Sequence, residues 1–227
     1  MSRVSKFLVF GAIAMLVSSV AMAQELKPIA LPAPQTHGGK PLMQALALRA
    51  TSRDFASTEL PMQTLSNLLW AAWGINRPKE KMRTAPSAID WQETDIYVVM
   101  KAGAYVYDAV ANTLKPDVSG DYRALTGTQP FVKDAPVTLV YAADASRMLI
   151  PKDWPQEMQD ATQEVMEGLK WADTAVIAQN VYLFAASEGL ATGIRALVDR
   201  PALASALQLS DNQSITMAQC VGFPKKK

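Results

Sequence analysis

Cysteine and histidine are nearly absent from this chain, whose 227 residues include one of each. The single cysteine, Cys220, excludes an intramolecular disulfide and any metal or iron–sulfur site built from several cysteines. It lies in an apolar, strand-like run, so we expect a small buried core residue. The single histidine, His37, lies in a segment rich in proline and glycine, and nothing near it supports a Ser-His-Asp or Cys-His catalytic set. Hydrolases of these types are therefore not expected, and no residue is predicted to bind a metal.

An excess of charge of either sign is missing as well. Lys and Arg number 22, Asp and Glu number 21, and the formal net charge is +1. Without residues 1–23, which carry two basic residues and no acidic one, the balance becomes 20 against 21, or −1. A nearly neutral chain has no electrostatic footprint for nucleic acid, so a nucleic-acid partner is not expected.

Residues 1–23 have the pattern of a secretory signal peptide. Arg3 and Lys6 provide the positive start, residues 7–17 form an apolar stretch, and a small-x-small pattern ends at Ala23. We expect cleavage after Ala23 and export, most simply to a bacterial periplasm, of a chain that forms one domain with a substantial core. An uncleaved membrane anchor is the alternative, but the apolar stretch is shorter than the roughly 20 residues that a span needs. No later segment is apolar enough to span a membrane.

Prolines and glycines in residues 24–40 predict an extended leader, followed by the domain at 41–227. Hydrophobic spacing predicts helices at 41–49, 60–74, 156–188 (one long helix or a broken pair, buried in its second half) and 201–207. β-Branched and aromatic residues predict strands at 95–100, 104–108, 136–142 and 214–221, the first two as a hairpin. The irregular alternation of helices and strands indicates an α+β fold.

Three polar segments are candidates for a ligand site. In the first, Arg49 and Arg53 lie four residues apart with Thr51 between them, which suits a phosphate because arginine donates paired charged hydrogen bonds. The second is a loop with Pro86, Ser87, Ala88 and Asp90, where small residues would allow a flat ligand to approach. The third contains Gly193 and Arg195 just after a buried helix. Each segment could equally be an ordinary surface loop or helix end.

Together the three segments resemble the FMN-dependent nitroreductase family, in particular its short, SagB-like dehydrogenase branch. The family pattern Arg-Arg-Ser-x-Arg-x-Phe matches residues 49–55, and Leu-Trp-Ala-x-x-Gly-x-Asn-Arg matches 69–77. Arg-x-x-Pro-Ser-Ala-x-Asn-x-Gln matches 83–92, the Gln-Asn to Gly-Leu element matches 179–190, and Val-Gly-Phe-Pro matches 221–224. The resemblance covers about the whole chain from Pro41 onward, with its motifs in the family order.

This resemblance implies a nitroreductase-like fold, with a central, mostly antiparallel sheet flanked by helices, and an intertwined homodimer that binds FMN at its interface. Arg49 and Thr51 would hold the phosphate and ribityl end, and Arg53 would stabilise the reduced flavin at its pyrimidine edge. Pro86, Ser87 and Ala88 would pack beside the ring from the second subunit, with Asp90 at the position of a family Asn that hydrogen-bonds the ring. Backbone near Gly193 to Ala196, a stretch that includes Arg195, would approach flavin N5 and O4.

Two departures from the family pattern bear on the cofactor. Ala50 replaces an arginine and removes one possible phosphate contact. Asp90 replaces an asparagine, and a carboxylate can accept from the ring N3–H but cannot donate to a ring carbonyl. An ionised Asp90 would also disfavour anionic reduced flavin and lower its redox potential. The lysines at 225–227 either add charge near the phosphate or form a solvated tail.

The resemblance therefore implies a flavin-dependent oxidoreductase that passes hydride or electron pairs to a small nitroaromatic or quinone-like acceptor in a ping-pong cycle. NAD(P)H is not expected outside the cytoplasm, so the electron donor stays open, with a membrane quinol or a redox protein as possibilities. One alternative is a non-enzymatic scaffold dimer of the same fold that has lost flavin or binds it inertly. Another is a flavin-dependent dehydrogenase that modifies peptides, against which the signal peptide counts.

Overall fold

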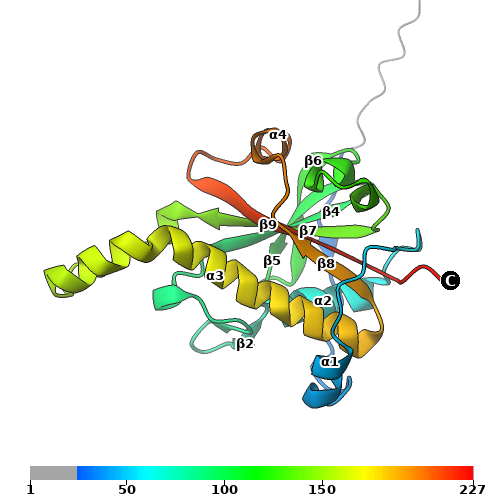
Figure 1. Cartoon of the computed structure of the whole chain (residues 1–227), viewed down its shortest axis with the longest axis horizontal. Coiled ribbons are helices and arrows are strands. Elements are labelled where there is room, and N and C mark those ends of the chain that lie inside the picture. The colour runs from blue at the N-terminus through cyan, green and yellow to red at the C-terminus, as the bar shows by residue number, and fades with distance from the viewer. Residues whose placement is uncertain (1–24, 227) are drawn as a thin grey trace, which may run out of the picture.

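A seven-stranded sheet forms the centre of the molecule, as the computed structural model of residues 25–226 shows (Figure 1). The predicted signal peptide lies outside these described residues. The strand order is β1-β6-β5-β4-β7-β9-β8, and every neighbouring pair is antiparallel. The strands are β1 (Ile29–Ala30), β4 (Thr94–Met100), β5 (Gly103–Asp108), β6 (Thr113–Ser119), β7 (Val137–Asp144), β8 (Ala191–Arg195) and β9 (Gln213–Gly222). A separate pair consists of β2 (Ile75–Arg77) and β3 (Met82–Arg83). The predicted α+β class and antiparallel sheet are confirmed.

Four α-helices and four short 3₁₀ turns complete the described chain. The helices are α1 (Leu42–Leu48), α2 (Met62–Trp73), α3 (Gln156–Glu188) and α4 (Arg200–Ala206). The turns are η1 (Ala88–Asp90), η2 (Arg123–Thr126), η3 (Pro130–Lys133) and η4 (Ala145–Arg147). The long helix α3 is a single element of 33 residues that ends where Gly189 adopts the left-handed conformation at φ 70°. Of the two predicted possibilities for this segment, the unbroken helix is the one found.

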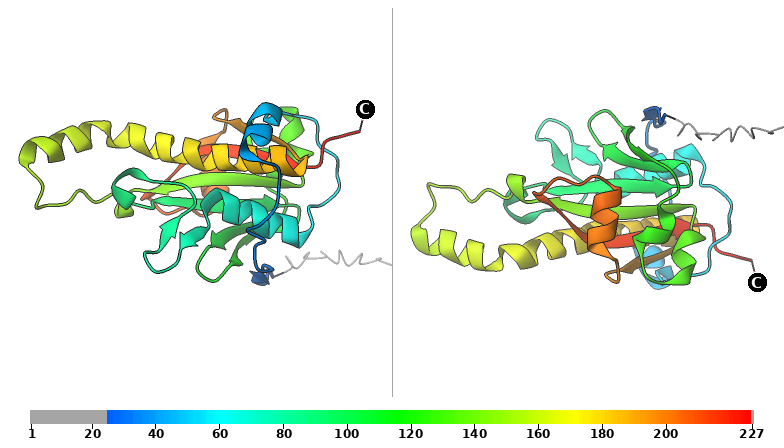
Figure 2. Two further views of the ribbon diagram at one scale, coloured as in Figure 1. Left: turned by 90° about the horizontal axis from the view of Figure 1, so that it is seen from below. Right: turned by 90° about the horizontal axis from the view of Figure 1, so that it is seen from above.

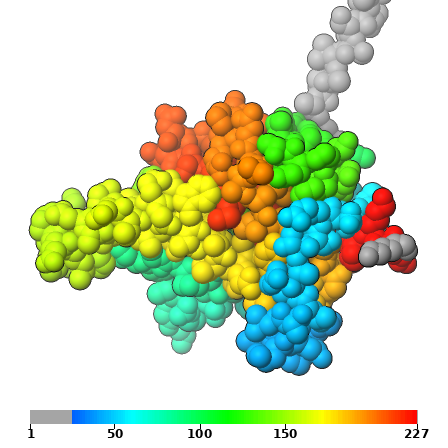
Figure 3. Space-filling model, viewed as in Figure 1, coloured from blue at the N-terminus to red at the C-terminus, as the bar shows by residue number. Residues whose placement is uncertain are grey.

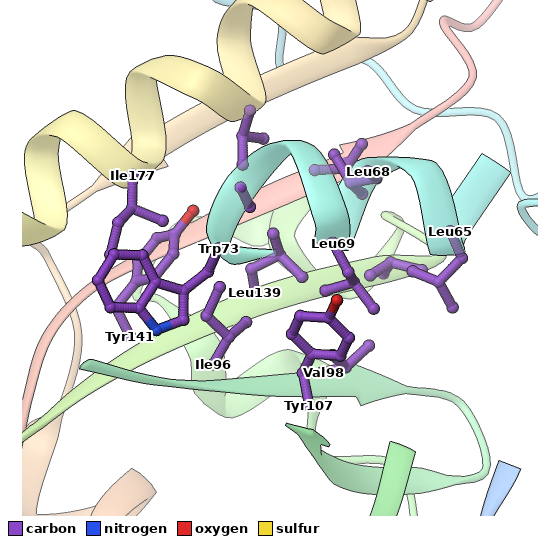
Figure 4. Packing of buried hydrophobic residues seen from close by; sticks show 14 of the residues in the cluster. Leu65, Leu68, Leu69, Trp73, Ile96, Val98, Tyr107, Leu139, Tyr141 and Ile177 are labelled. Atoms are coloured by element: carbon purple, nitrogen blue, oxygen red, sulfur yellow. The ribbon is translucent and has the colours of Figure 1, made fainter. Parts of the chain in front are cut away.

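Helices α2 and α3 cover one face of the sheet, and the main core lies between them and the strands (Figure 4). Leu65, Leu68 and Leu69 recur at helical spacing on α2 and point at the sheet, which is why this segment is helical and buried. The side chains that they meet include Ile96, Val98, Tyr107, Leu139, Tyr141 and Ile177. The opposite face of the sheet carries a smaller cluster that α4 covers through Leu203 and the adjoining Leu207.

The two halves of α3 differ in their surroundings. Every buried residue of the helix lies at or beyond Asp173, whereas the beginning of the helix projects past the end of the sheet (Figures 1 and 2). The expected burial of the second half is right for Ile177 and Val181 but wrong for Val176, which is 39% exposed because it lies on the outer face of the helix. In α1, Leu42, Leu46 and Leu48 are all exposed. This helix forms a separate protrusion in the space-filling view (Figure 3).

Strands β6 and β8 were not predicted, and both contain residues that disfavour strands in isolation. Pro116 lies within β6, and Gly193 lies within β8. Pairing with β5 and β9, respectively, holds them extended. The predicted leader also contributes a strand, because β1 pairs with β6 and Leu31 is buried against the core.

Candidate functional site

The first and third predicted segments lie side by side. Ser52 donates its backbone N–H to the carbonyl oxygen of Thr192 at 2.9 Å, which fastens the Arg49–Arg53 segment to the outer edge of β8. A Cβ atom on Gly193 would lie 3.2 Å from the carbonyl oxygen of Ser52 and 3.3 Å from Cγ2 of Thr51. Glycine at position 193 therefore permits this close approach of two backbones.

Tyr182 of α3 joins these two segments. Its hydroxyl oxygen lies 2.9 Å from the Thr51 hydroxyl and accepts the backbone N–H of Ile194 at 3.0 Å. The Arg49 guanidinium carbon lies 5.4 Å from the centroid of the Tyr182 ring, within cation–π range. Sequence reasoning missed this residue. The available signal was a tyrosine on the buried face of a helix, since a buried tyrosine hydroxyl usually has a hydrogen-bond partner.

Arg49 and Arg53 are available for an anion. Neither makes an ion pair or a side-chain hydrogen bond within residues 25–226, and Arg53 is exposed. Each of the other arginines in that range donates at least one side-chain hydrogen bond: Arg77, Arg83, Arg123, Arg147, Arg195 and Arg200. Two unpaired guanidinium groups beside a threonine hydroxyl and a close backbone suit a phosphate-bearing ligand.

The Arg195 side chain has a structural task instead. It is 8% exposed, and its guanidinium donates to the carbonyl and hydroxyl oxygens of Thr126, each at 3.1 Å. A third, longer bond of 3.4 Å reaches the carbonyl oxygen of Gly193, and the group lies 5.8 Å from the Phe131 ring centroid. Because these contacts use the guanidinium, we expect Arg195 to contribute to a ligand site through its backbone, as predicted for this segment.

The second predicted segment forms a strained turn around η1. Three residues that are not glycine adopt the left-handed conformation: Ile89 at φ 52°, Asp90 at 58° and Gln92 at 48°. Such residues are held by surrounding contacts, because each costs free energy. The Ser87 hydroxyl oxygen accepts the backbone N–H of Gln92 at 3.0 Å, and Asp90 Oδ1 accepts from the Gln92 amide at 2.9 Å.

Further contacts fasten this turn to the body of the protein. Arg83 donates to Gln92 Oε1 at 2.8 Å and to the carbonyl oxygen of Trp73 at 3.0 Å. Asp173 of α3 accepts the backbone N–H of Ala88 at 2.8 Å. Pro86 and Asp90 remain exposed, while Ser87 and Ala88 are half-buried.

Within one protomer the first and second predicted segments do not meet. No hydrogen bond in the described range joins residues 49–53 to residues 86–90. The first segment is fastened near Tyr182 and the second near Asp173, nine residues apart on α3, which is about 13.5 Å along a helix axis. The two segments therefore do not contact one another directly within one protomer.

Residues 25–226 contain neither a metal-binding cluster nor a helix that could span a membrane. No group of three or more His, Cys, Asp or Glu side chains that could hold a metal ion occurs there. None of the helices in that range is long and apolar enough to cross a membrane.

Comparisons with known proteins identify the family. The sequence model of the Nitroreductase family matches residues 46–223, so the chain belongs to this family. A curated relative described as a candidate nitroreductase from Methanocaldococcus jannaschii is 28% identical over 165 residues, which cover 66% of this chain and 76% of that protein. Members of the family are generally flavin-dependent oxidoreductases and usually homodimers.

Solved structures agree with this assignment. A candidate nitroreductase from Ralstonia eutropha JMP134 superimposes with a TM-score of 0.80 at 36% identity, covering 92% of this chain and 93% of that chain. A candidate nitroreductase from Anabaena variabilis has a TM-score of 0.68 at 16% identity, covering 88% of this chain and 42% of that one. The McbBCD microcin synthetase of Escherichia coli has a TM-score of 0.64 at 15% identity, covering 96% and 85%. The last two likenesses show the fold alone.

Proposed function

We propose that this protein is an FMN-dependent oxidoreductase that acts on a small organic acceptor as a homodimer. The single observation that supports this most directly is the cluster of Arg49, Thr51 and Tyr182 against the Gly193 backbone. Unpaired guanidinium groups, a hydroxyl and a backbone without a side chain are what a phosphate-bearing flat cofactor requires. The residues present therefore fit FMN.

In this proposal, Arg49 and Thr51 bind the phosphate and ribityl end, and Tyr182 holds Thr51 in place. Arg53, which is exposed and unpaired among the described residues, places positive charge where negative charge develops at the pyrimidine edge. A bound flavin would supply the hydride chemistry. The protein residues bind it, orient it and stabilise charge, and donor and acceptor would use the site in turn, as in a ping-pong cycle.

A second subunit would complete the site. Exposed apolar side chains lie on α1, including Leu42 at 63% and Met43 at 76%, and on the projecting half of α3, including Met158 at 48% and Val165 at 51%. Such a set is unusual for a surface that faces only water. We propose that these surfaces pack in the homodimer, which would bring Pro86, Ser87, Ala88 and Asp90 of one subunit to the Arg49–Arg53 segment of the other.

Export and electron supply form a second part of the proposal. If residues 1–23 are a signal peptide, the enzyme works outside the cytoplasm, and a quinol or a redox protein is a more suitable donor than NAD(P)H. We expect weak NAD(P)H-driven turnover in vitro. Robust saturable kinetics with NADPH would count against a quinol or a redox protein as the donor. Membership of the SagB-like branch is proposed from the sequence motifs alone.

The first test is the visible spectrum of residues 24–227, purified with FMN and then desalted. One FMN retained per subunit supports the proposal. A folded, dimeric but colourless protein favours the flavin-free scaffold that Ala50 and Asp90 suggest. Arg53→Ala then tests the site: we expect loss of flavin or a slower reductive half-reaction with the fold intact. Arg77→Ala is the control, because Arg77 is exposed but bonded to Asn76 and is not assigned to the site.

A further inference from the structure

Two carboxyl groups are buried directly behind the strained turn at residues 86–90. Glu93 is fully buried, and Asp173 of α3 is 8% exposed. Oδ2 of Asp173 accepts the backbone N–H of Ala88 at 2.8 Å. Oε1 of Glu93 accepts from the Thr94 hydroxyl at 3.2 Å, but its Oε2 is buried with no donor in the described range. As an ionised group, Glu93 would therefore be a buried charge with an unsatisfied oxygen.

The Asp173 carboxyl lies beside the Glu93 carboxyl, close enough for one to donate a hydrogen bond to the other when one of them carries a proton. Two carboxylates cannot bond to one another, since each offers acceptors only, whereas a protonated carboxyl can donate to an ionised one. Burial is the main cause that raises the pKa of both groups, and the charge of Asp173 raises the pKa of Glu93 further. A single proton between them lets one carboxyl donate to the other and leaves only one negative charge buried.

The charged groups around the pair offset a second negative charge only in part. Arg147 of η4 donates to the backbone carbonyl oxygen of Glu93 at 2.6 Å, but its charge is shared with Asp95 at 2.7 Å and Asp144 at 3.5 Å. Lys170, one turn earlier on α3, pairs with a neighbouring glutamate at 2.6 Å. With one proton in the pair, Glu93 is neutral and Asp173 is ionised. The main hydrogen-bond donor to Asp173 is then the backbone N–H of Ala88 in the turn.

We propose that Glu93 and Asp173 share one proton and that this pair positions the 86–90 turn against α3, with Asp173 as the positioning residue. The importance of this turn for a cofactor rests on the proposed function, but the shared proton does not. Ile89 and Asp90 are in unfavourable backbone conformations, so the turn keeps its shape only while its anchors hold.

The pair makes the turn sensitive to pH in one direction. The pKa of Glu93 in the folded protein lies above its value in an unfolded chain. A group shifted in this way contributes stability that is present at low pH and is lost as the pH rises through the folded-state value. Ionisation of Glu93 would place a second negative charge beside Asp173, so we expect the contact with Ala88 to weaken as the pH rises.

Amide hydrogen exchange in a peptide covering residues 86–92 tests this in the flavin-free dimer. After correction for intrinsic exchange, opening of the turn should increase with pH in the wild type. Glu93→Gln should remove that increase, because an amide of the same shape donates to Asp173 at every pH. Asp173→Ala should open the turn by about tenfold or more at all pH values, since it removes a charged acceptor.

Infrared spectroscopy provides a second measurement that a purely structural role would not affect. In a pH titration, the wild type should keep carbonyl bands of protonated carboxylic acids above the pH at which exposed carboxyl groups ionise, and Glu93→Gln should remove one of these bands. Asp117→Asn is the control: burial raises the pKa of Asp117 to about 6, and its Oδ2 also has no partner in the described residues. That variant should leave exchange at 86–92 unchanged, because Asp117 lies on β6.

The outcomes separate this inference from the proposed function. An unchanged pH dependence in Glu93→Gln, or infrared bands that the substitution leaves unchanged, overturn the shared proton even if FMN binds. A protein that shows the expected exchange and band but retains no FMN supports the pair and contradicts the cofactor proposal. If Asp173→Ala fails to fold, the exchange of Glu93→Gln and the infrared spectrum still test the shared proton.

Discussion

The two halves of the proposed cofactor site are held by different means. The Arg49–Arg53 segment lies along β8, where one backbone hydrogen bond and the Tyr182 hydroxyl fix it at an edge of the sheet. Within the described residues, no backbone hydrogen bond joins the 86–90 turn to a strand, and side-chain anchors keep its left-handed residues in place. The first half is thus an extension of the sheet, whereas the second stores strain that its anchors must offset.

Because the two segments are held differently, we expect them to respond differently to substitutions. The position of the Arg49–Arg53 segment should depend on the few contacts that join it to the core, since the sheet that it borders is stable. A strained turn should respond to substitutions that relieve its backbone, and these should stabilise the fold while loosening the site. Stability and ligand binding are then expected to change together in the first half and in opposite directions in the second.

Tyr182→Phe should have the largest effect of the three substitutions. It leaves the Ile194 N–H and the Thr51 hydroxyl without their partner, which should lower the free energy of unfolding by about 1–2 kcal/mol and weaken FMN binding. Urea denaturation and flavin titration would measure both. Tyr105→Phe is the matched control, because this residue is buried but its hydroxyl makes no hydrogen bond within residues 25–226, so that the loss of the hydroxyl should be nearly neutral. Equal losses in the two variants would contradict the role of Tyr182.

Ile89→Gly should act in the opposite direction on stability. Glycine adopts φ 52° without the cost that a β-branched residue incurs, so the free energy of unfolding should rise by about 0.5–1 kcal/mol. Flavin retention should fall, because the turn becomes less rigid. Ala88→Gly, at a neighbouring position outside the left-handed region, should instead lower the free energy of unfolding by a similar amount. A loss of stability in both variants would show that the turn is not strained.

Asp90→Asn should leave the fold almost unchanged and alter the flavin. Asparagine can still accept from the Gln92 amide, so the turn keeps this bond. Removing a negative charge near the ring should raise the two-electron midpoint potential, on the order of 30 mV for an interaction equivalent to one pKa unit. Redox titration would measure the shift against Asp54→Asn, which removes an exposed carboxylate from the sheet-anchored half and should shift the potential less. An unchanged potential in Asp90→Asn would mean that its side chain points away from the ring.

Sequence patterns predicted the parts of the fold that depend on neighbours along the chain. The helical spacing of Leu65, Leu68 and Leu69 marked α2, and β-branched and aromatic residues marked the β4–β5 hairpin and β7. They did not mark β6 or β8, since Pro116 and Gly193 are strand residues only because a neighbouring strand holds them. The burial of Val176 was misjudged because hydrophobicity does not say which face of a long helix meets the sheet.

The sequence by itself determined the family, through motifs whose order and residue types carry the resemblance. It also determined which residues bring charge and which bring flexibility to the candidate site. Only the tertiary structure decided how these residues are held. Thr51 meets Tyr182 across 131 positions, and Ala88 meets Asp173 across 85. Contacts of this kind leave no local periodicity in a single sequence, because they arise where elements distant along the chain pack on the same sheet.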